Sequence, residues 1–87
     1  MNWERYGYVV ASNYRKKIIL LLAKGEKTPA QLAAEAGMYI SHVCATLSDL
    51  TGKGLVKCLT PELRRGKIYS LTSEGKEVYE KLKHLQR

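Results

Sequence analysis

The chain has 87 residues, and its 15 lysines and arginines outnumber its 8 acidic residues, which gives a formal net charge of +7. A chain of this length folds as one domain that buries roughly 60 to 65% of its unfolded surface, so a core plus a deep active-site cleft is unexpected. We therefore expect a single domain over residues 1–87 that is not an enzyme. The basic charge favours a polyanionic partner, with nucleic acid as the first candidate.

The N-terminal part of the chain predicts one core helix over about 9–24, ended by Gly25. Lys16 and Lys17 fall on the opposite side of this helix, where they are either a solvated face or contacts to phosphate. No apolar run is long enough to span a membrane and no signal-peptide pattern is present, so we expect a cytoplasmic protein. The apolar positions of the helix are Ala11, Tyr14, Ile18, Leu21 and Leu22.

Residues 28–53 predict two short helices joined by a tight turn, which is a helix-turn-helix. Thr28 is a suitable N-cap, Pro29 takes the first helical position, and Gln31 completes a capping box. Gly37 supplies the left-handed residue that ends this first helix.

The second helix of the motif should bury one face and expose a small, polar one. Lys27 alone opposes Glu26, Glu35 and Asp49 over 26–50, so this stretch has a net charge of −2 and the flanks carry the positive excess. The expected buried positions are Val43, Leu47 and Leu50, and the expected exposed positions are Ser41, Ala45 and Ser48.

Residues 55–71 predict a β-hairpin with a basic tip, and residues 73–85 predict a C-terminal helix. Alternation with β-branched and aromatic side chains supports strands over 55–59 and 67–71, separated by the polar turn 60–66. Thr72 or Ser73 should cap the last helix. Its apolar stripe is Gly75, Val78, Leu82 and Leu85.

Three helices, a two-stranded hairpin and a final helix follow the order of a winged helix. Residues 37–47 and 54–56 resemble the "glsrstVsrhLkrLeekGLV" signature of winged-helix regulators of the MarR and ArsR kind. Residues 69–75 are similar to the "Y.LT..G" that follows the wing in these regulators. The resemblance implies an α+β, mainly α fold: a winged helix-turn-helix with a three-helix core, a two-stranded β wing and a C-terminal helix. It also implies a transcriptional regulator that binds double-stranded DNA.

The resemblance implies that the second helix of the motif enters the major groove and that the wing contacts phosphates or the minor groove. Between Met38 and Thr51 there is no lysine or arginine, so the common arginine contact to guanine is missing and specificity should be modest or based on DNA shape. The candidate positions on the helix are Tyr39, Ser41, His42, Ala45 and Thr46, which would otherwise be an ordinary exposed helix face. The candidates on the wing are Lys57, Arg64, Arg65 and Lys67, with Lys16 and Lys17 as second-rank phosphate contacts.

Several partner and ligand questions have more than one answer at this stage. Cys44 and Cys58 form no CxxC pair and should be buried, reduced thiols, so we expect no metal site and no cofactor. A small-molecule effector is left open. Tyr39 and Ile40 could instead contact a protein partner, and the charge would also suit an architectural DNA-coating protein. We also expect a homodimer. Its predicted contact residues, which could instead simply cover the core of their own chain, are Trp3, Tyr6, Tyr8, Val78, Leu82 and Leu85.

Overall fold

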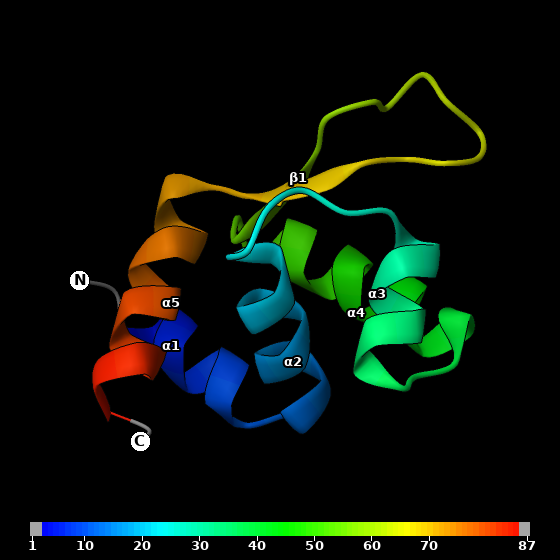
Figure 1. Cartoon of the computed structure of the whole chain (residues 1–87). Helices are drawn as coiled ribbons and strands as arrows, with labels where there is room; N and C mark the ends of the chain where they lie inside the picture. Colours follow the sequence, from blue (N-terminus) through cyan, green and yellow to red (C-terminus); the bar gives the residue numbers. More distant parts are fainter. Residues whose placement is uncertain (1–2, 86–87) are drawn as a thin grey trace.

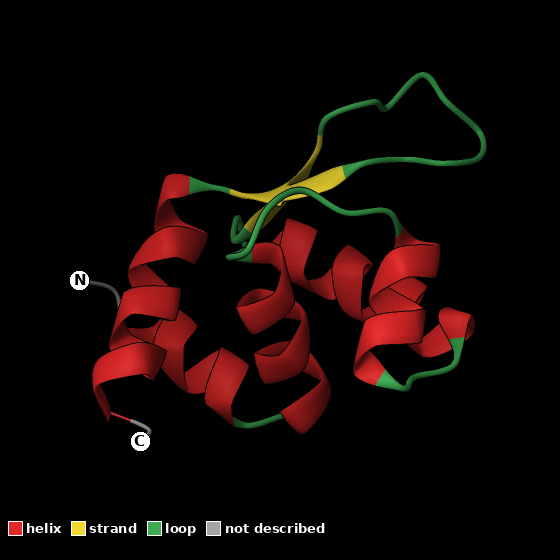
Figure 2. Cartoon of the chain, in the orientation of Figure 1, coloured by secondary structure: helices red, strands yellow, loops and turns green. Residues whose placement is uncertain are grey.

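The computed structural model describes residues 3–85, with the side chain of Leu85 left aside, and confirms the winged-helix architecture (Figures 1 and 2). Five helices surround a core, and a two-stranded antiparallel sheet carries a long loop away from the body. No helix in this part of the chain is long and apolar enough to cross a membrane. In chain order the elements are α1 (Trp3–Val10), α2 (Asn13–Leu22), α3 (Pro29–Ala36), α4 (Ile40–Gly52), β1 (Val56–Cys58), β2 (Tyr69–Leu71) and α5 (Ser73–Leu85).

The single helix predicted over 9–24 is wrong, because the chain breaks between α1 and α2. Ser12 adopts an extended backbone and caps α2, its Oγ accepting a hydrogen bond from the Arg15 backbone N–H at 3.4 Å. The inward face of α2 also differs from the predicted one. Ile19 is fully buried, whereas Tyr14, expected in the core, is 44% exposed.

The start of the helix-turn-helix is formed as predicted. The Thr28 hydroxyl accepts from the Gln31 backbone N–H at 3.2 Å, and the Gln31 side-chain oxygen accepts from the Thr28 N–H at 2.9 Å. Gly37 ends α3 in the left-handed conformation, with φ of 66°. These local interactions satisfy backbone groups that helix ends leave without partners.

The core lies among α2, α3 and α4, and α1 and α5 close it from the other side (Figure 1). Val78 and Leu82 of α5 are only 1% and 2% exposed, because they pack into this core. The expectation that they present a stripe for a second subunit is therefore wrong. The buried centre contributed by the first four helices includes Val9, Ile18, Ile19, Leu22, Leu32, Val43, Leu47 and Leu50.

The wing is a shorter ladder than predicted, with Val56 opposite Leu71 and Cys58 opposite Tyr69. Beyond it, the Thr60 hydroxyl accepts from the Ile68 N–H at 3.0 Å, so a side chain takes the place of a ladder carbonyl. The loop before α3 adds a further pairing that the sequence pattern did not indicate. Lys27 and Tyr69 exchange two backbone hydrogen bonds, of 3.1 and 2.8 Å.

The base of the wing is fastened to the body where β2 runs into α5. Thr72 Oγ1 donates to the Gly54 carbonyl at 2.6 Å and accepts from the Gly75 N–H at 3.1 Å, so Thr72 is the cap of α5. Gly75 is buried against the backbone of Leu55, and a methyl group on Gly75 would overlap the Leu55 carbonyl oxygen. The direction in which the wing leaves the body is therefore set by close backbone contacts.

Candidate nucleic-acid interface

One side of α4 faces solvent with small and apolar side chains, and we call it the exposed stripe of α4. Tyr39, which caps the helix, is 77% exposed and Ile40 is 53% exposed. None of the stripe positions is charged. The stripe consists of Ile40, Ser41, Cys44, Ala45 and Ser48, all of them exposed.

Thr46 does not belong to this surface, contrary to the expectation from the sequence. It is 7% exposed, and its hydroxyl donates to the His42 carbonyl at 2.7 Å. Thr46 lies three residues after Val43 and beside Leu47, so the helical repeat places it on the core face. Because its hydroxyl is bonded to the helix backbone, Thr46 is not part of the candidate interface.

His42 lies between two tyrosines at the start of α4. Its ring centroid is 5.4 Å from that of Tyr14 on α2, with an interplanar angle of 31°, and 5.8 Å from that of Tyr39, at 85°. Tyr14 was not predicted at this site, because its spacing to Ile18 placed it among the core positions. The signal that could have found it is Ser12, a favoured N-cap residue that places Tyr14 in the first turn of a new helix.

A groove of about 430 Å³ separates the exposed stripe of α4 from the wing. Ile40 and Cys44 line it from α4, and Arg64, Arg65 and Lys67 line it from the wing. The two sets of predicted residues therefore meet across one groove, with a neutral wall on the helix side and a cationic wall on the wing side.

The wing cations keep their charge available to solvent. Lys57, Arg64 and Arg65 are exposed, whereas Lys67 is half-buried. The ion pairs Lys27–Glu35 and Lys83–Glu80 do not involve these cations, and the single acidic residue of the wing tip, Glu62, is outnumbered by Arg64, Arg65 and Lys67.

The two second-rank lysines are less free. The Lys17 ammonium donates to the Ala36 carbonyl at 3.4 Å, at the end of α3, and Lys16 is half-buried. Their neighbour Arg15 lies over the Tyr8 ring at 3.8 Å and donates to the Tyr8 carbonyl at 2.8 Å. This part of α2 serves mainly to hold α1, α2 and α3 together.

The two cysteines differ in exposure, and the expectation that both are buried is wrong for Cys44. Cys44 is exposed on α4, and Cys58 is half-buried beside Tyr69. Burial, and then the nearby thiols of Cys58 and Cys44, raise the pKa of the Tyr69 hydroxyl. Across residues 3–84, no three His, Cys, Asp or Glu side chains come close enough to hold a metal ion.

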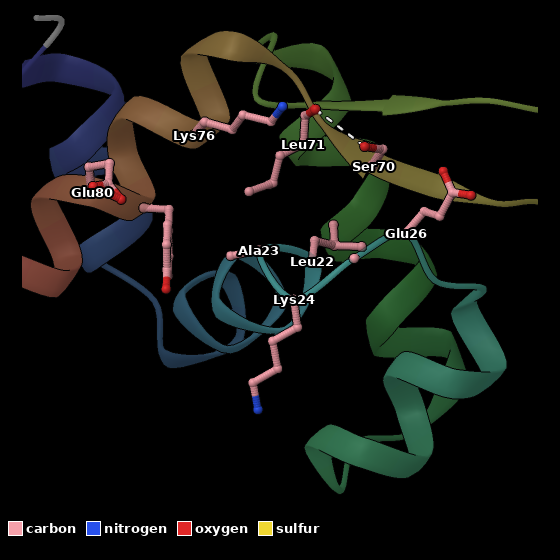
Figure 3. A pocket seen from close by; sticks show the side chains of 10 residues that line it. Leu22, Ala23, Lys24, Glu26, Ser70, Leu71, Lys76 and Glu80 are labelled. Carbon is pink, nitrogen blue, oxygen red and sulfur yellow. Dashed lines mark hydrogen bonds between the residues drawn. The ribbon is translucent and has the colours of Figure 1, made fainter.

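A second, open pocket of about 580 Å³ lies among the end of α2, β2 and α5 (Figure 3). Lys24 and Lys76 line it together with Glu26 and Glu80, so its rim carries both signs of charge. Such a rim favours neither an anionic nor a cationic ligand. The groove between α4 and the wing is the better candidate for a polyanion.

On the surface of α1 beside α5, one of the residues predicted to form a dimer contact, Trp3, is exposed. Trp3 is 56% exposed, its ring lies 5.6 Å from that of Tyr6, and the Lys81 ammonium lies 4.8 Å over it. Tyr6 and Tyr8 are partly buried against the chain's own core. The side chain of Leu85 lies outside the described residues.

No family model matches the sequence, and no curated protein matches it. Several solved structures, in contrast, are similar to this chain. A homodimeric winged helix-turn-helix DNA-binding domain from Mycobacterium bovis, Mb0332, described as a possible ArsR-family transcriptional regulator, is 26% identical over 94% of this chain and 75% of its own, with a TM-score of 0.75. RV1404 from Mycobacterium tuberculosis is 24% identical over 84% of this chain and 51% of its own, with a TM-score of 0.76.

MarR from E. coli, in its reduced form, is 25% identical over 79% of this chain and 52% of its own, with a TM-score of 0.71. The chain thus spans about half the length of MarR and of RV1404. By its fold, the chain is a winged helix-turn-helix domain, similar to Mb0332 and to part of MarR.

Proposed function

We propose that this protein is a DNA-binding transcriptional regulator, a binding protein rather than an enzyme. In this proposal α4 enters the major groove and the wing lies on phosphates or in the adjacent minor groove. The observation that carries the proposal is the single groove with the exposed stripe of α4 on one side and Arg64 and Arg65 on the other. The descriptions of Mb0332 as a DNA-binding domain and of Thermotoga maritima Tm0710 as a transcriptional regulator support it.

The division of charge between the two walls assigns them different tasks. Lysine and arginine contacts to phosphate release condensed counterions, which supplies most of the sequence-independent affinity. The wing and the flanking lysines are the source of such contacts here. The exposed stripe of α4 has no cation, so it contributes to the choice among sequences through base edges rather than to attraction as such.

We further propose that two copies associate through α1 and α5, with Trp3 at the contact. The homodimeric state of the Mb0332 domain supports this arrangement. A half-exposed tryptophan packed edge to face against Tyr6 is the kind of rigid aromatic anchor that protein interfaces favour. Two copies of α4 would then meet half-sites about one helical turn apart.

Binding titrations against random and genomic duplexes, repeated over a salt series, test the function. A regulator selects particular fragments, and its affinity for them exceeds its affinity for the random pool. A DNA-coating protein binds every duplex alike with a steep salt dependence. A protein-interaction module, which the exposed Tyr39 and Ile40 would also suit, binds no duplex tightly.

Alkylation of the two cysteines tests where DNA lies. Cys44 lines the groove, whereas Cys58 is half-buried on β1 and serves as the internal reference. Saturating duplex should slow the modification of Cys44 relative to Cys58. An unchanged ratio of the two rates, at a DNA concentration that saturates binding, would contradict the placement of DNA in this groove.

A further inference from the structure

We propose that α4 recognises thymine methyl groups, so that the duplexes this protein prefers carry T·A pairs where they face the exposed stripe. This inference rests on the proposed function and specifies the DNA that the same surface selects. It concerns the choice among sequences, not the attraction to DNA.

The composition of the exposed stripe carries the inference. Ile40 and Ala45 present hydrocarbon and Cys44 presents a thiol, so on the stripe itself only two serine hydroxyls can form ordinary hydrogen bonds with bases, and His42 lies beside it. The commonest contacts to guanine need arginine or lysine, and those to adenine need asparagine or glutamine, none of which occurs on the stripe. The thymine methyl is the one apolar group that an unmodified base pair shows in the major groove.

The position of Ile40 makes such a contact reachable. Ile40 is 53% exposed at the first residue of α4, and it lines the groove opposite Arg64 and Arg65. Those cations attract phosphates to the groove, and a duplex held there brings its base edges toward the stripe. Positive charge on the wing thus attracts the DNA, and the apolar side chains of α4 favour thymine at the contacted positions.

Replacing thymine by deoxyuridine tests the inference, because it removes the methyl and leaves every hydrogen-bonding group and phosphate in place. The probe is the best-bound duplex selected from a pool with a random centre, prepared with either base. Burial of one methyl corresponds to about a fourfold change in affinity. We expect the deoxyuridine duplex to bind about fourfold more weakly for each contacted thymine, with the salt dependence unchanged.

Ile40→Ser identifies the protein side of the contact, because it removes the methyl groups of an exposed side chain at a helix start and leaves a small polar one. We expect this variant to reduce the ratio of thymine to deoxyuridine affinity. Leu20→Ser is the matched control: Leu20 is a 41% exposed aliphatic residue on α2 that does not line the groove, and its substitution should leave the ratio unchanged. Circular dichroism checks that both variants are folded.

The outcomes separate this inference from the proposed function. Equal affinities of the wild type for the two duplexes would overturn the inference, while the preference for the selected duplex would still support a regulator. A thymine preference that Ile40→Ser leaves intact would also overturn it, because Ile40 carries the methyl groups on the α4 wall of the groove. Failure to bind any duplex would instead contradict the proposed function.

Discussion

The two sides of the groove, α4 and the wing tip, are built in opposite ways. α4 is held by four side chains on its inner face, and its exposed stripe carries no charge. The wing tip has exposed arginines and rests on backbone hydrogen bonds near its base, such as the 2.7 Å bond from the Leu59 N–H to the Ile68 carbonyl. The inner face of α4 consists of Val43, Thr46, Leu47 and Leu50.

This contrast indicates how a small domain divides its tasks. A rigid helix can present a fixed pattern to base edges, which requires an accurate orientation. Phosphates recur along the whole duplex, so a cationic loop can contact them without an accurate orientation. The wing base, fastened through Thr72 and Gly75, keeps the two elements in one relative position.

The strongest way to break this arrangement is Gly75→Ala. The added methyl would overlap the Leu55 carbonyl, so α5 and the base of the wing must separate. Overpacking of this kind costs about 1 to 3 kcal/mol of unfolding free energy. Urea denaturation measures the loss, and DNA binding should fall with it.

The matched control for Gly75→Ala is Gly52→Ala at the end of α4. Nothing lies within 4 Å of the position of the added methyl there, and the backbone is helical. Alanine should therefore stabilise the protein by up to about 1 kcal/mol. Equal stability changes in the two variants would mean that the contact between Gly75 and Leu55 does not set the position of the wing.

The double substitution Arg64→Ala with Arg65→Ala removes the cationic wall. Each lost phosphate contact lowers the slope of log affinity against log salt concentration by about 0.9. The ratio of wild-type to variant affinity for DNA should therefore fall about tenfold between about 50 and 200 mM salt. Sequence preference should survive. Filter-binding or anisotropy titrations at several salt concentrations give both quantities.

A control for charge alone is Lys24→Ala with Lys76→Ala, which lowers the net charge equally at the pocket among α2, β2 and α5. We expect this pair to change the salt slope much less than the wing pair. If both pairs lower the slope to the same extent, general charge rather than the wing attracts DNA.

His42→Ala sharpens the comparison from the helix side. His42 is exposed on α4, and its ring also holds Tyr14 and Tyr39. Loss of one base hydrogen bond should cost about 1 kcal/mol at the best site and little on random DNA. The loss of sequence preference is measured by comparing selected-sequence profiles at one salt concentration for wild type, His42→Ala and the control His84→Ala. Identical profiles in all three proteins would remove His42 from the interface.

The smallest expected effect concerns Tyr69, whose pKa is raised by burial beside Cys58. Its native pKa lies above the unfolded value of about 10, so the neutral hydroxyl stabilises the fold below pH 10 and this stability is lost as pH rises through the native pKa. An ultraviolet tyrosine titration should lose its highest-pH component in Tyr69→Phe. Persistence of that component would assign it to another tyrosine.

Local signals in the sequence were enough for the helix-turn-helix and for the order of the elements from α3 onward. The capping box at Thr28 and the left-handed Gly37 depend only on neighbouring residues, and both were predicted. The break before Ser12 was missed because apolar spacing continues across it, and spacing alone does not report where a helix restarts.

The parts of the candidate site that were mispredicted depend on packing between distant segments. Whether Val78 and Leu82 face a partner or their own core is decided by α1 and α2, which lie far away in sequence. The pairing of Lys27 with Tyr69 joins residues that no local pattern connects. Thr46 was predicted on the exposed face but is buried, because a shift of one helical position separates the core face from the exposed stripe.

The separation between a fastened wing base and an exposed tip has a consequence for protein engineering. Residues 61–66 are all exposed, so added residues there would displace no core side chain. Lengthening a flexible loop costs little, about 0.6 kcal/mol for each doubling of its length. The tip is therefore a suitable place to insert a peptide tag or a fluorophore-binding segment, or to graft a longer loop from another protein, while the helical body keeps its fold.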